Sequence, residues 1–442
     1  MQDDTSNRQS TYRVVIVGGG AGGLELAAKL GRRFGAEHVL LIDRNPEHIW
    51  KPSLHEVAAG TLDIHREGLS YFLLARDRRF SFTLGEVGGL DREARHVLLK
   101  PIFDRDGHEI VPARRVRYDT LVMAVGSTSN FFGTPGAAEH AVALDSTAQA
   151  ENFRLLLMRE LILLNERKPQ DPEARLNIAI VGGGATGVEL AAELLEARRG
   201  MSFYGLKNLK PTEDVRVTLL EGGPRLLPAL PERLSQAARG LLEERGVRVE
   251  TGVRVARVAP DGLYDTHDAC YPAQLCVWAA GIEAPAFLAN LGLACNRLHQ
   301  LEVDEHLRTE DPDIYAIGDC AHAPWIGEQG EFLPARAQVA HQQSSYLAGM
   351  ITARIRNQPM PDKPFRFKDY GSLVSVGHSK GVGSLMGVLS GRSWLVEGLL
   401  ARSMYMSLHL MHHLAVLGPM RTLSMAVGRL FLKRSTHRVK LH

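Results

Sequence analysis

Residues 178–195 read IAIVGGGATGVELAAELL, and residues 14–30 carry a close copy of them, VVIVGGGAGGLELAAKL. Each copy starts with an apolar, β-branched run that is typical of a buried parallel strand. A glycine-rich turn follows, and then a run of good helix formers. This order is that of a strand–turn–helix unit that binds a dinucleotide. The repeat therefore predicts an α/β protein with two dinucleotide-binding units.

The first turn has the spacing Gly18-x-Gly20-x-x-Gly23. In such a turn the first glycine lets the chain reverse sharply, the second lets the backbone approach a pyrophosphate, and the third lets the helix pack closely on its strand. The N-terminus of the helix then faces the phosphates. The next strand, HVLLID, ends at Asp43, where a carboxylate can hold ribose hydroxyl groups.

The second turn, Gly182-x-Gly184-x-x-Gly187, repeats this arrangement, and the strand after its helix ends at Glu221. A carboxylate at this position favours a free 2′-hydroxyl and repels a 2′-phosphate, so we expect NADH rather than NADPH. A redox enzyme that holds a flavin and a nicotinamide together needs two such sites. A purely structural role for the glycines is the alternative, and two turns in the same context make it the weaker one.

The composition is that of a globular protein of 442 residues, 45% of them hydrophobic and 23% charged. This length suggests two or three domains. The formal net charge of +2 argues against a nucleic-acid partner for the molecule as a whole. Residues 392–442 differ, because they carry eight basic residues against one acid, Glu397. The C-terminal segment is thus a separate basic module.

Neither a secretory signal nor an apolar run of 18–20 residues that could cross a bilayer is visible, so we expect the body of the protein in the cytoplasm. The four cysteines form no CxxC or CxxxxC pair, which argues against a disulfide reductase and favours small buried residues. The histidines show no metal-ligand spacing with carboxylate partners, so we expect no metal site.

Several further segments make the chain similar to the type II, non-proton-pumping NADH:quinone oxidoreductases, in their bacterial respiratory form. The similarity runs from about residue 12 to the C-terminus, and one departure is Ser344, where many relatives have glycine. Besides the two turns, the segments that carry it are HIWKPSLHEVAAG (48–60), GSTSNFFGTPG (126–136), EGGPRLLPALP (221–231), WAAGIEAP (278–285), IYAIGDCA (314–321), RAQVAHQQ (336–343) and KDYGSLVSVG (368–377).

The resemblance implies two Rossmann-like domains in a glutathione-reductase-like arrangement and a C-terminal α+β module that anchors the protein to a membrane. It also implies non-covalent FAD, NADH as substrate, and ubiquinone or menaquinone as acceptor, without proton pumping. The order of the motifs then predicts a split FAD-binding domain at 11–135 and 304–358, an inserted NADH-binding domain at 136–303, and the C-terminal module at 359–442.

The match to the family's motifs assigns residues to each nucleotide. For FAD these residues are Gly18, Gly20, Ala21, Gly22, Gly23, Asp43, Arg44, Lys51, Val87, Ala124, Gly126 and Asp319. For NADH they are Gly182, Gly184, Ala185, Thr186, Gly187, Glu189, Glu221, Ala280 and Gly281. Asp319 ends a strand, and in flavoproteins of this layout such an acid contacts the ribityl chain; capping of a helix is its alternative role.

Hydride transfer between nicotinamide and flavin needs positioning and electrostatics from the protein rather than an acid. The resemblance places Glu189 beside the contact of the two rings, where it would orient the nicotinamide and either relay a proton or tune the reduced flavin. Stabilisation by the helix N-terminus is the simpler role, and Glu25 occupies the same place in the first copy. The resemblance also puts Lys51 beside the flavin, where its charge could stabilise a reduced ring.

Gln338 is the candidate for the residue that faces the quinone. Gln342 follows four residues later on the same helix face, so both amides could line one slot. An amide can donate to a quinone carbonyl without adding a full charge. An ordinary polar helix start is the alternative.

The segment 394–432 reads as two apolar helices that Gly418 and Pro419 separate. With their basic border they predict a monotopic anchor on an anionic lipid surface. A helical hairpin packed on the protein itself or on a twin subunit is the alternative, and we expect a homodimer. The expected location is the cytoplasmic face of a bacterial inner membrane, as part of the respiratory chain.

Two other functions remain open from the sequence. A soluble NADH-dependent flavoprotein reductase for a protein acceptor would need neither the basic tail nor the RAQVAHQQ segment. A flavin-binding redox sensor would bind NADH and stay reduced in the presence of a quinone.

Overall fold

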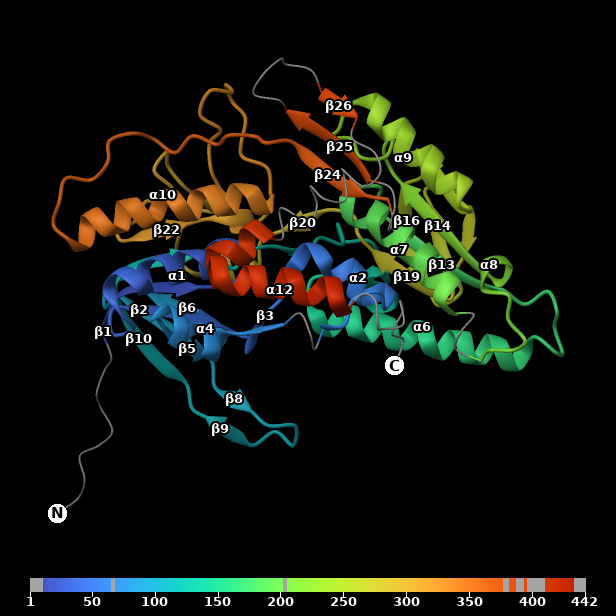
Figure 1. The fold of residues 1–442 in the computed structure, drawn as a ribbon, viewed down its shortest axis with the longest axis horizontal. Helices are drawn as coiled ribbons and strands as arrows, with labels where there is room; N and C mark the ends of the chain where they lie inside the picture. The colour runs from blue at the N-terminus through green and yellow to red at the C-terminus, as the bar shows by residue number, and fades with distance from the viewer. Residues whose placement is uncertain are drawn as a thin grey trace.

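The computed structural model describes residues 11–64, 68–201, 205–376, 381–386, 393–395 and 410–432. Two α/β units lie beside each other, and the C-terminal segment touches both of them (Figure 1). Its strands contact helices of the second unit, whereas residues 410–417 contact the first unit.

The first unit is built on a seven-stranded sheet with β1 (Thr11–Val17) inside it. β1 pairs in parallel with β2 (Val39–Asp43) on one side and with β10 (Arg114–Met123) on the other. β22 (Ile314–Ala316) pairs in parallel with the end of β10, although it comes far later in the chain. The other strands are β5 (Ser81–Leu84), β6 (Val87–Asp91) and β7 (His96–Leu99).

Both faces of this sheet are buried. Val14 and Ile16 of β1 belong to one apolar cluster, and Val15 and Val17 belong to another. Burial on both faces explains why the strand is apolar at every position rather than at every second one. On the first face α1 (Ala21–Phe34) packs against α10 (Ala337–Ile355) and α4 (Tyr71–Arg78).

The second unit repeats this plan with a five-stranded parallel sheet in the order β12-β19-β13-β14-β15. β13 (Leu176–Val181) leads through the second glycine turn into α7 (Ala185–Met201), and β14 (Val215–Glu221) follows. Its other elements are β12 (Val142–Ala143), α6 (Thr147–Arg167), α8 (Pro211–Asp214), α9 (Glu232–Glu244), β15 (Val247–Thr251), β16 (Val255–Ala259), β17 (Gly262–Asp265), β18 (Cys270–Pro272) and β19 (Leu275–Trp278).

Short elements connect the two units and decorate them. They are β3 (Glu47–His48), η1 (Lys51–Ser53), α2 (Leu54–Ala59), β4 (Leu69–Ser70), β8 (Ile102–Phe103), β9 (Glu109–Val111), β11 (Thr128–Ser129), α5 (Ala137–His140), β20 (Ile282–Glu283), η3 (Ala286–Asn290), β21 (Leu301–Glu302), η4 (Gly318–Cys320) and β23 (Ala321–His322). The predicted α/β class with two dinucleotide-binding units is confirmed.

The C-terminal segment combines a small sheet with helices. β24 (Ser372–Ser375), β25 (Gly381–Met386) and β26 (Ser393–Leu395) form an antiparallel sheet. Residues 410–417 are helical, and α12 (Pro419–Leu432) follows them. The break falls at Gly418, whose φ of +79° suits glycine.

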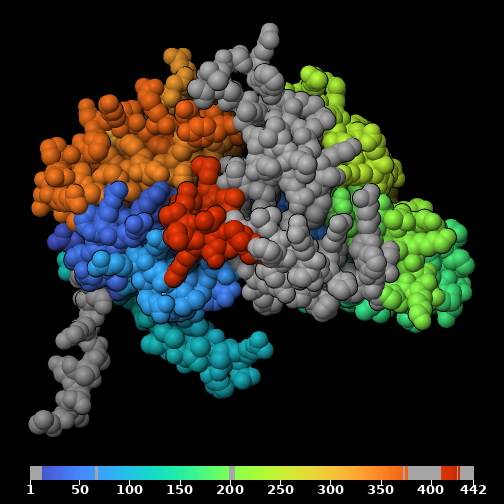
Figure 2. Space-filling model, viewed as in Figure 1, coloured from blue at the N-terminus to red at the C-terminus, as the bar shows by residue number. Residues whose placement is uncertain are grey.

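α12 lies on the surface of the molecule (Figure 2). Its side chains Met420, Leu423 and Val427 are exposed. Arg421 forms an ion pair with Asp77 of α4. Among the described residues, no helix is long and apolar enough to cross a membrane. Most of the predicted basic border lies outside the described residues, namely Arg392, Arg402, Lys433, Arg434, Arg438 and Lys440.

Candidate functional site

The two glycine turns have the same geometry. Gly18 has a φ of +100°, and an added Cβ would lie 2.3 Å from the Ala124 carbonyl oxygen; Gly182 has a φ of +111° and a corresponding distance of 2.6 Å to Ala279. Side chains are therefore excluded at the first position of each turn. This exclusion is the one that a sharp strand-to-helix turn requires.

The second and third glycines of each turn differ in the space around them. A Cβ at Gly23 or Gly187 would lie 1.9 Å from the carbonyl oxygen of the first glycine of its turn, so the helix could not pack there. Gly20 and Gly184 instead face open space, with nothing within 4 Å of an added Cβ. Each turn thus exposes its backbone at the second glycine, where a pyrophosphate would approach.

The predicted acids close both turns. Asp43 Oδ2 accepts a 2.6 Å hydrogen bond from the Gly19 amide, and burial raises the pKa of Asp43. Glu221 Oε2 accepts an equal 2.6 Å bond from the Gly183 amide, and its Oε1 accepts one from Gly223. The carboxylate at each strand end is therefore held against the turn at which a ribose would lie.

Ser127 brings two of the residues assigned to FAD together. Lys51 Nζ donates to the Ser127 carbonyl oxygen at 2.7 Å and lies 3.6 Å from Asp145 Oδ1. Ser127 Oγ donates to Asp319 Oδ2 at 2.8 Å. Lys51 and Asp319 thus flank one short segment, although the sequence places them far apart. The sequence analysis did not single out Ser127. Its only signal in the sequence is that it directly follows Gly126, in the turn after β10.

Gln343 is a second residue that sequence reasoning missed. Its side chain is buried, and its Oε1 accepts a 2.7 Å bond from the Gly318 amide, which fixes α10 to the turn before Asp319. Gly22 lets α1 approach Ile317 and α10 closely, because an added Cβ would lie 3.1 Å from Ile317 and 3.3 Å from Ala340. The signal in the sequence was the doubled glutamine of RAQVAHQQ.

The remaining assigned residues surround the two turns. Gly126 has a φ of +72° with open space beside it, and Gly281 has a φ of +69° with the Phe132 ring 2.2 Å from an added Cβ. Trp278 Nε1 donates to the Ala280 carbonyl oxygen. Ala21, Ala185 and Thr186 lie in the first helical turns, Arg44 is exposed after β2, and Val87 is buried at the start of β6.

Glu189 lies where both units and the C-terminal sheet meet. Its Oε1 accepts a 3.0 Å bond from the Ser375 amide, and its Oε2 is 3.6 Å from His55 Nδ1 of α2. Burial raises the pKa of Glu189 to about 8, with Glu56 and Glu193 adding to the effect, and burial lowers the pKa of His55 to about 4. At neutral pH the contact is therefore between a carboxylic acid and a neutral imidazole.

His55 has one further property. Its Nε2 atom is buried and has no hydrogen-bond partner within the described protein. A buried nitrogen without a partner costs free energy unless a bound group satisfies it. The atom belongs to the HIWKPSLHEVAAG segment that the sequence associates with the flavin.

Gln338 and Gln342 lie one turn apart on α10, as predicted, and both bind main chain. Gln338 Nε2 donates to the Gly371 carbonyl oxygen at 3.0 Å, and its Oε1 accepts from the Tyr370 amide. Gln342 makes a two-point contact with the main chain of Lys368 at 2.8 and 3.0 Å. These amides hold the segment that leads into β24.

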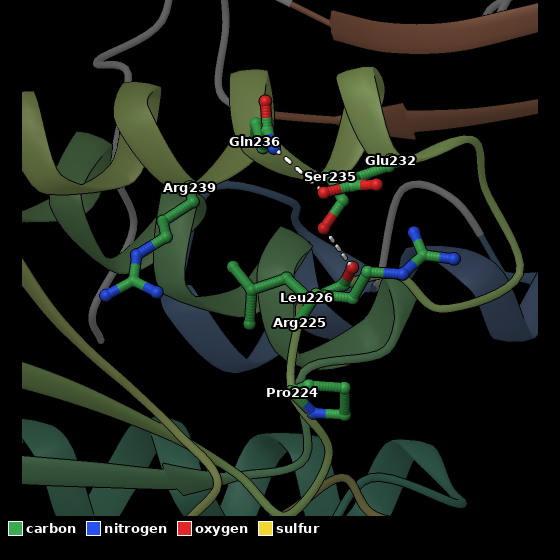
Figure 3. Close-up of a pocket in the computed structure, with 7 residues that line it drawn as sticks. All are labelled: Pro224, Arg225, Leu226, Glu232, Ser235, Gln236 and Arg239. Atoms are coloured by element: carbon green, nitrogen blue, oxygen red, sulfur yellow. Dashed lines mark hydrogen bonds between the residues drawn. The ribbon is translucent and has the colours of Figure 1, made fainter.

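The loop after Glu221 forms a small pocket with α9 (Figure 3). Ser235 Oγ donates to the Leu226 carbonyl oxygen across it at 2.5 Å. Arg225 donates to the carbonyl oxygens of Leu230 and Pro228, and Arg239 pairs with Glu243, so both arginines are already engaged. The other lining residues are Pro224, Glu232 and Gln236.

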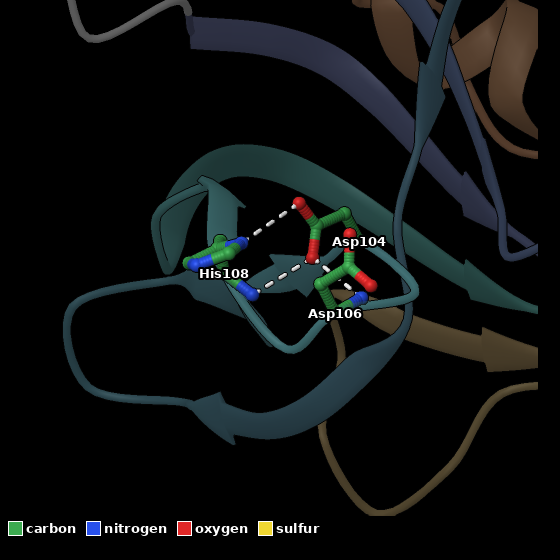
Figure 4. A group of neighbouring side chains, drawn as sticks. All are labelled: Asp104, Asp106 and His108. Atoms are coloured by element: carbon green, nitrogen blue, oxygen red, sulfur yellow. Dashed lines mark hydrogen bonds and ion pairs between the residues drawn. The ribbon is translucent and has the colours of Figure 1, made fainter.

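Asp104, Asp106 and His108 gather in the exposed hairpin between β8 and β9 (Figure 4). Asp104 Oδ1 accepts hydrogen bonds from the amides of Asp106 and His108, which is the pattern of a tight Asx turn. The turn accounts for the cluster without a metal ion.

The cysteines are only partly as expected. Cys276 and Cys320 are buried, and burial raises the pKa of their thiols to about 12 and about 11. Cys295 is half-buried, and Cys270 is exposed on β18, so the prediction that all four are buried was wrong. β18 is an edge strand of the small antiparallel sheet, which leaves its side chains open to solvent.

Comparisons with known proteins agree with this geometry. Residues 12–344 match the pyridine nucleotide-disulphide oxidoreductase family. The chain is 41% identical to the type II NADH:quinone oxidoreductase of Haemophilus influenzae over 422 residues, which cover 92% of this chain and 94% of that protein. It is 28% identical to the corresponding Ndh of Mycobacterium tuberculosis over 89% of this chain and 85% of that one.

Solved structures share the fold. NDH2 from Plasmodium falciparum in complex with NADH matches 98% of this chain and 100% of its own with a TM-score of 0.79 at 19% identity. The sulfide:quinone oxidoreductase of Aquifex aeolicus matches 96% of both chains with a TM-score of 0.67 at 18% identity. The likeness to the H. influenzae enzyme over nearly its whole length goes further than the fold, and the chain therefore belongs to the type II NADH:quinone oxidoreductases, which oxidise NADH and reduce a quinone.

Proposed function

We propose that this enzyme is a peripheral membrane flavoprotein that keeps FAD in its first unit, admits NADH to its second, and reduces a membrane quinone without pumping protons. One observation carries the proposal: Glu189 of the second unit lies 3.6 Å from His55 of α2, an element that comes from the proposed FAD-binding part of the chain and packs on α6 and α7, and Ser375 of the C-terminal sheet donates to Glu189. Residues from the proposed NADH-binding domain, the proposed FAD-binding domain and the C-terminal module therefore meet at one buried contact.

The residues of the first unit fit a flavin dinucleotide. The open face at Gly20 suits the pyrophosphate, Asp43 suits the ribose, and Asp319 with Ser127 suits the ribityl chain. The unpartnered Nε2 of His55 suits a polar atom of a bound ring. Bound FAD supplies an acceptor for the hydride of NADH and a donor of electrons to the quinone.

In the second unit, Gly184 and Glu221 would bind NADH in the same manner. Glu189, protonated at neutral pH, would orient the nicotinamide and hold a proton close to the flavin. Lys51 would stabilise negative charge on the reduced ring, since its ammonium group is held beside Ser127.

The quinone side would lie at the N-terminal part of α10. Gln338 and Gln342 present their amides on one face there, and the segment 368–371 covers them. For either amide to donate to a quinone carbonyl, it would exchange a main-chain partner for the quinone. Such an exchange costs little because one hydrogen bond replaces another.

Membrane contact would run through α12 at the cytoplasmic face of a bacterial inner membrane. Met420, Leu423 and Val427 offer an exposed apolar stripe, and the basic residues of the C-terminal segment favour anionic lipid. A homodimer is compatible with this surface. The domains would divide as 11–135 with 304–358, 136–303, and 359–442.

Anaerobic half-reactions test the assignment. We expect the purified protein to be yellow, to be bleached by NADH, and to regain colour when a short-chain quinone is added. Gln338→Leu should slow the second step and leave the first nearly unchanged, whereas Gln358→Leu, at an exposed position after α10, should change neither. Equal slowing of both steps by Gln338→Leu would contradict the quinone role. A colourless protein that takes up no FAD would contradict the whole proposal.

A further inference from the structure

Glu25 sits in α1 at the place that Glu189 occupies in α7, but its surroundings are different. The side chain is 1% exposed. Its Oε2 lies 2.6 Å from His341 Nδ1 of α10, and its Oε1 lies 3.0 Å from His412 Nδ1 of the C-terminal segment. Lys29 Nζ completes the group at 3.4 Å. One buried carboxylate therefore joins α1, α10 and the segment that leads into α12.

The contact continues through a second histidine. His412 Nε2 lies 2.9 Å from His48 Nε2, and His48 Nδ1 lies 2.9 Å from the Gly19 carbonyl oxygen in the first glycine turn. The His412 ring also packs against Trp50 at a centroid distance of 4.6 Å, with the two planes tilted by 34°. The chain of contacts thus runs from the first glycine turn to the helix that carries Gln338 and Gln342.

The hydrogen-bonding roles of these groups determine which ring nitrogens of His48 and His412 carry protons. A carbonyl oxygen only accepts, so His48 Nδ1 carries a proton. The contact between the two Nε2 atoms needs one proton, and an ionised Glu25 needs one on His412 Nδ1. Three ring protons on two imidazoles make one positive charge. The pair of histidines therefore forms a buried ion pair with Glu25.

The groups around the carboxylate support its ionised form. Burial opposes ionisation of Glu25, but the hydrogen bonds and charges of His341 and His412 outweigh it and hold the pKa at about 2. Burial and the neighbouring His412 lower the pKa of His48 to about 3. Further titratable groups that face the cluster are Lys29 of α1, His413 beside His412, and Tyr71, whose hydroxyl donates to the Gly19 carbonyl oxygen.

We propose that Glu25 is a positioning residue for the reduction of the quinone: its carboxylate docks His412, and with it the C-terminal helical segment, onto the same helix α10 that it orients through His341. His341 lies three residues after Gln338 on the same face of the helix, and it directly precedes Gln342. Loss of the charge at Glu25 releases the C-terminal segment and shifts the acceptor side. The inference rests on the proposed position of the quinone at α10.

The segment has a second tie that serves as a control. Arg421 of α12 pairs with Asp77 of α4, but Arg421 is largely exposed, and exposed ion pairs contribute little. Glu25→Gln and Asp77→Asn each remove one negative charge that holds the C-terminal segment, one buried and one at the surface. His412→Gln removes the other partner of the buried contact, and it keeps the proposal testable if Glu25→Gln does not fold.

Two measurements on the full-length enzyme test the proposal. Hydrogen exchange by mass spectrometry reports docking of residues 410–417, and stopped-flow absorbance reports flavin reduction by NADH and reoxidation by a ubiquinone with one isoprene unit. In Glu25→Gln and His412→Gln we expect protection of 410–417 to fall by about tenfold or more, as for the loss of one charged hydrogen bond. We expect a raised KM for the quinone, slower reoxidation and unchanged reduction by NADH.

Asp77→Asn should leave the protection and both half-reactions near those of the wild type. Unchanged protection of 410–417 in both buried variants would overturn the proposal, and so would normal reoxidation despite lost protection. Equal loss of both half-reactions would overturn it too, because Glu25 would then act on the first unit as a whole. If the quinone fails to reoxidise even the wild type, the proposed function fails, whereas the exchange data still report on the docking.

Discussion

Glu189→Gln should make the enzyme more stable than the wild type, and the difference should grow as the pH rises. The substitution keeps the shape of the side chain and an oxygen that can accept from the Ser375 amide. It removes the carboxyl group that burial holds protonated, with a pKa of about 8. At neutral pH the folded wild-type chain holds this proton and the unfolded chain does not, whereas the variant shows no such difference between the two states.

The size of the effect follows from linkage. The folded pKa is raised above the model value of 4.5, so the wild type has its full stability below pH 4.5 and loses it as the pH rises toward 8. Each pH unit in this window costs about 1.4 kcal/mol. Between pH 5 and pH 7.5 the wild type should therefore lose about 3 kcal/mol relative to Glu189→Gln. Above pH 8 the difference should level off.

Thermal unfolding of the holoenzyme between pH 5 and pH 8.5 measures this difference. For a chain of this length, 1 kcal/mol shifts Tm by about 1 °C, so the gap in Tm should widen by about 3 °C. Glu93→Gln, at an exposed position, is the control and should show no gap that changes with pH. A constant gap would refute the protonated state of Glu189. A gap of opposite sign would show that Glu189 is ionised and paired with a protonated His55.

Three further predictions concern the second unit. Gly187→Ala should prevent folding, because the added Cβ lies 1.9 Å from a carbonyl oxygen, whereas Gly184→Ala should keep the wild-type Tm and raise KM for NADH; equal effects on Tm would contradict the separate roles of the two glycines. Lys168→Met should lower Tm by about 2 °C, because Asp214 loses its 2.6 Å partner and keeps the Arg175 ion pair and the Lys210 amide, and Lys210→Met at an exposed pair should have no effect; equal shifts would contradict the burial argument. Cys270 should react with a thiol reagent well before Cys276 and Cys320 in the native enzyme, and a Cys270→Ser variant that keeps the fast phase would contradict this order.

The repeated turn was predictable because its glycine spacing lies within a short stretch of sequence, although the atoms that exclude a side chain at its first glycine come from a distant strand end. Gly18 and Gly23 exclude side chains through atoms of their own turn and the adjacent strand, and Gly182 and Gly187 repeat the same contacts. The break at Gly418 was predictable for the same reason, since a left-handed glycine before proline ends a helix wherever it occurs. The fold class, the order of the two units and the geometry of the glycine turns could therefore be predicted from patterns in short stretches of sequence.

The contacts that the site residues make could not be predicted from short stretches of sequence. Lys51 and Asp319 meet through Ser127, and His412 meets Glu25 across almost the whole length of the chain. Such contacts depend on how β22 and α10 return to the first sheet. The amides of Gln338 and Gln342 show the same limit, because their main-chain partners lie on a segment whose path the helix pattern does not encode.

The two helix acids show why position in a motif does not decide chemistry. Glu25 and Glu189 each stand two residues after the third glycine of their turn, and both are almost wholly buried. Glu25 faces two imidazole nitrogens and an ammonium group, so the attraction of these groups overcomes the cost of burying its charge. Glu189 receives one amide hydrogen bond and lies near two other acids, so the cost of burial prevails and the proton stays. One fold element, used twice, thus supplies a fixed anion beside the C-terminal segment and a neutral acid between the two units. The charges within reach of each carboxyl group separate them: cationic donors surround Glu25, and other acids lie near Glu189.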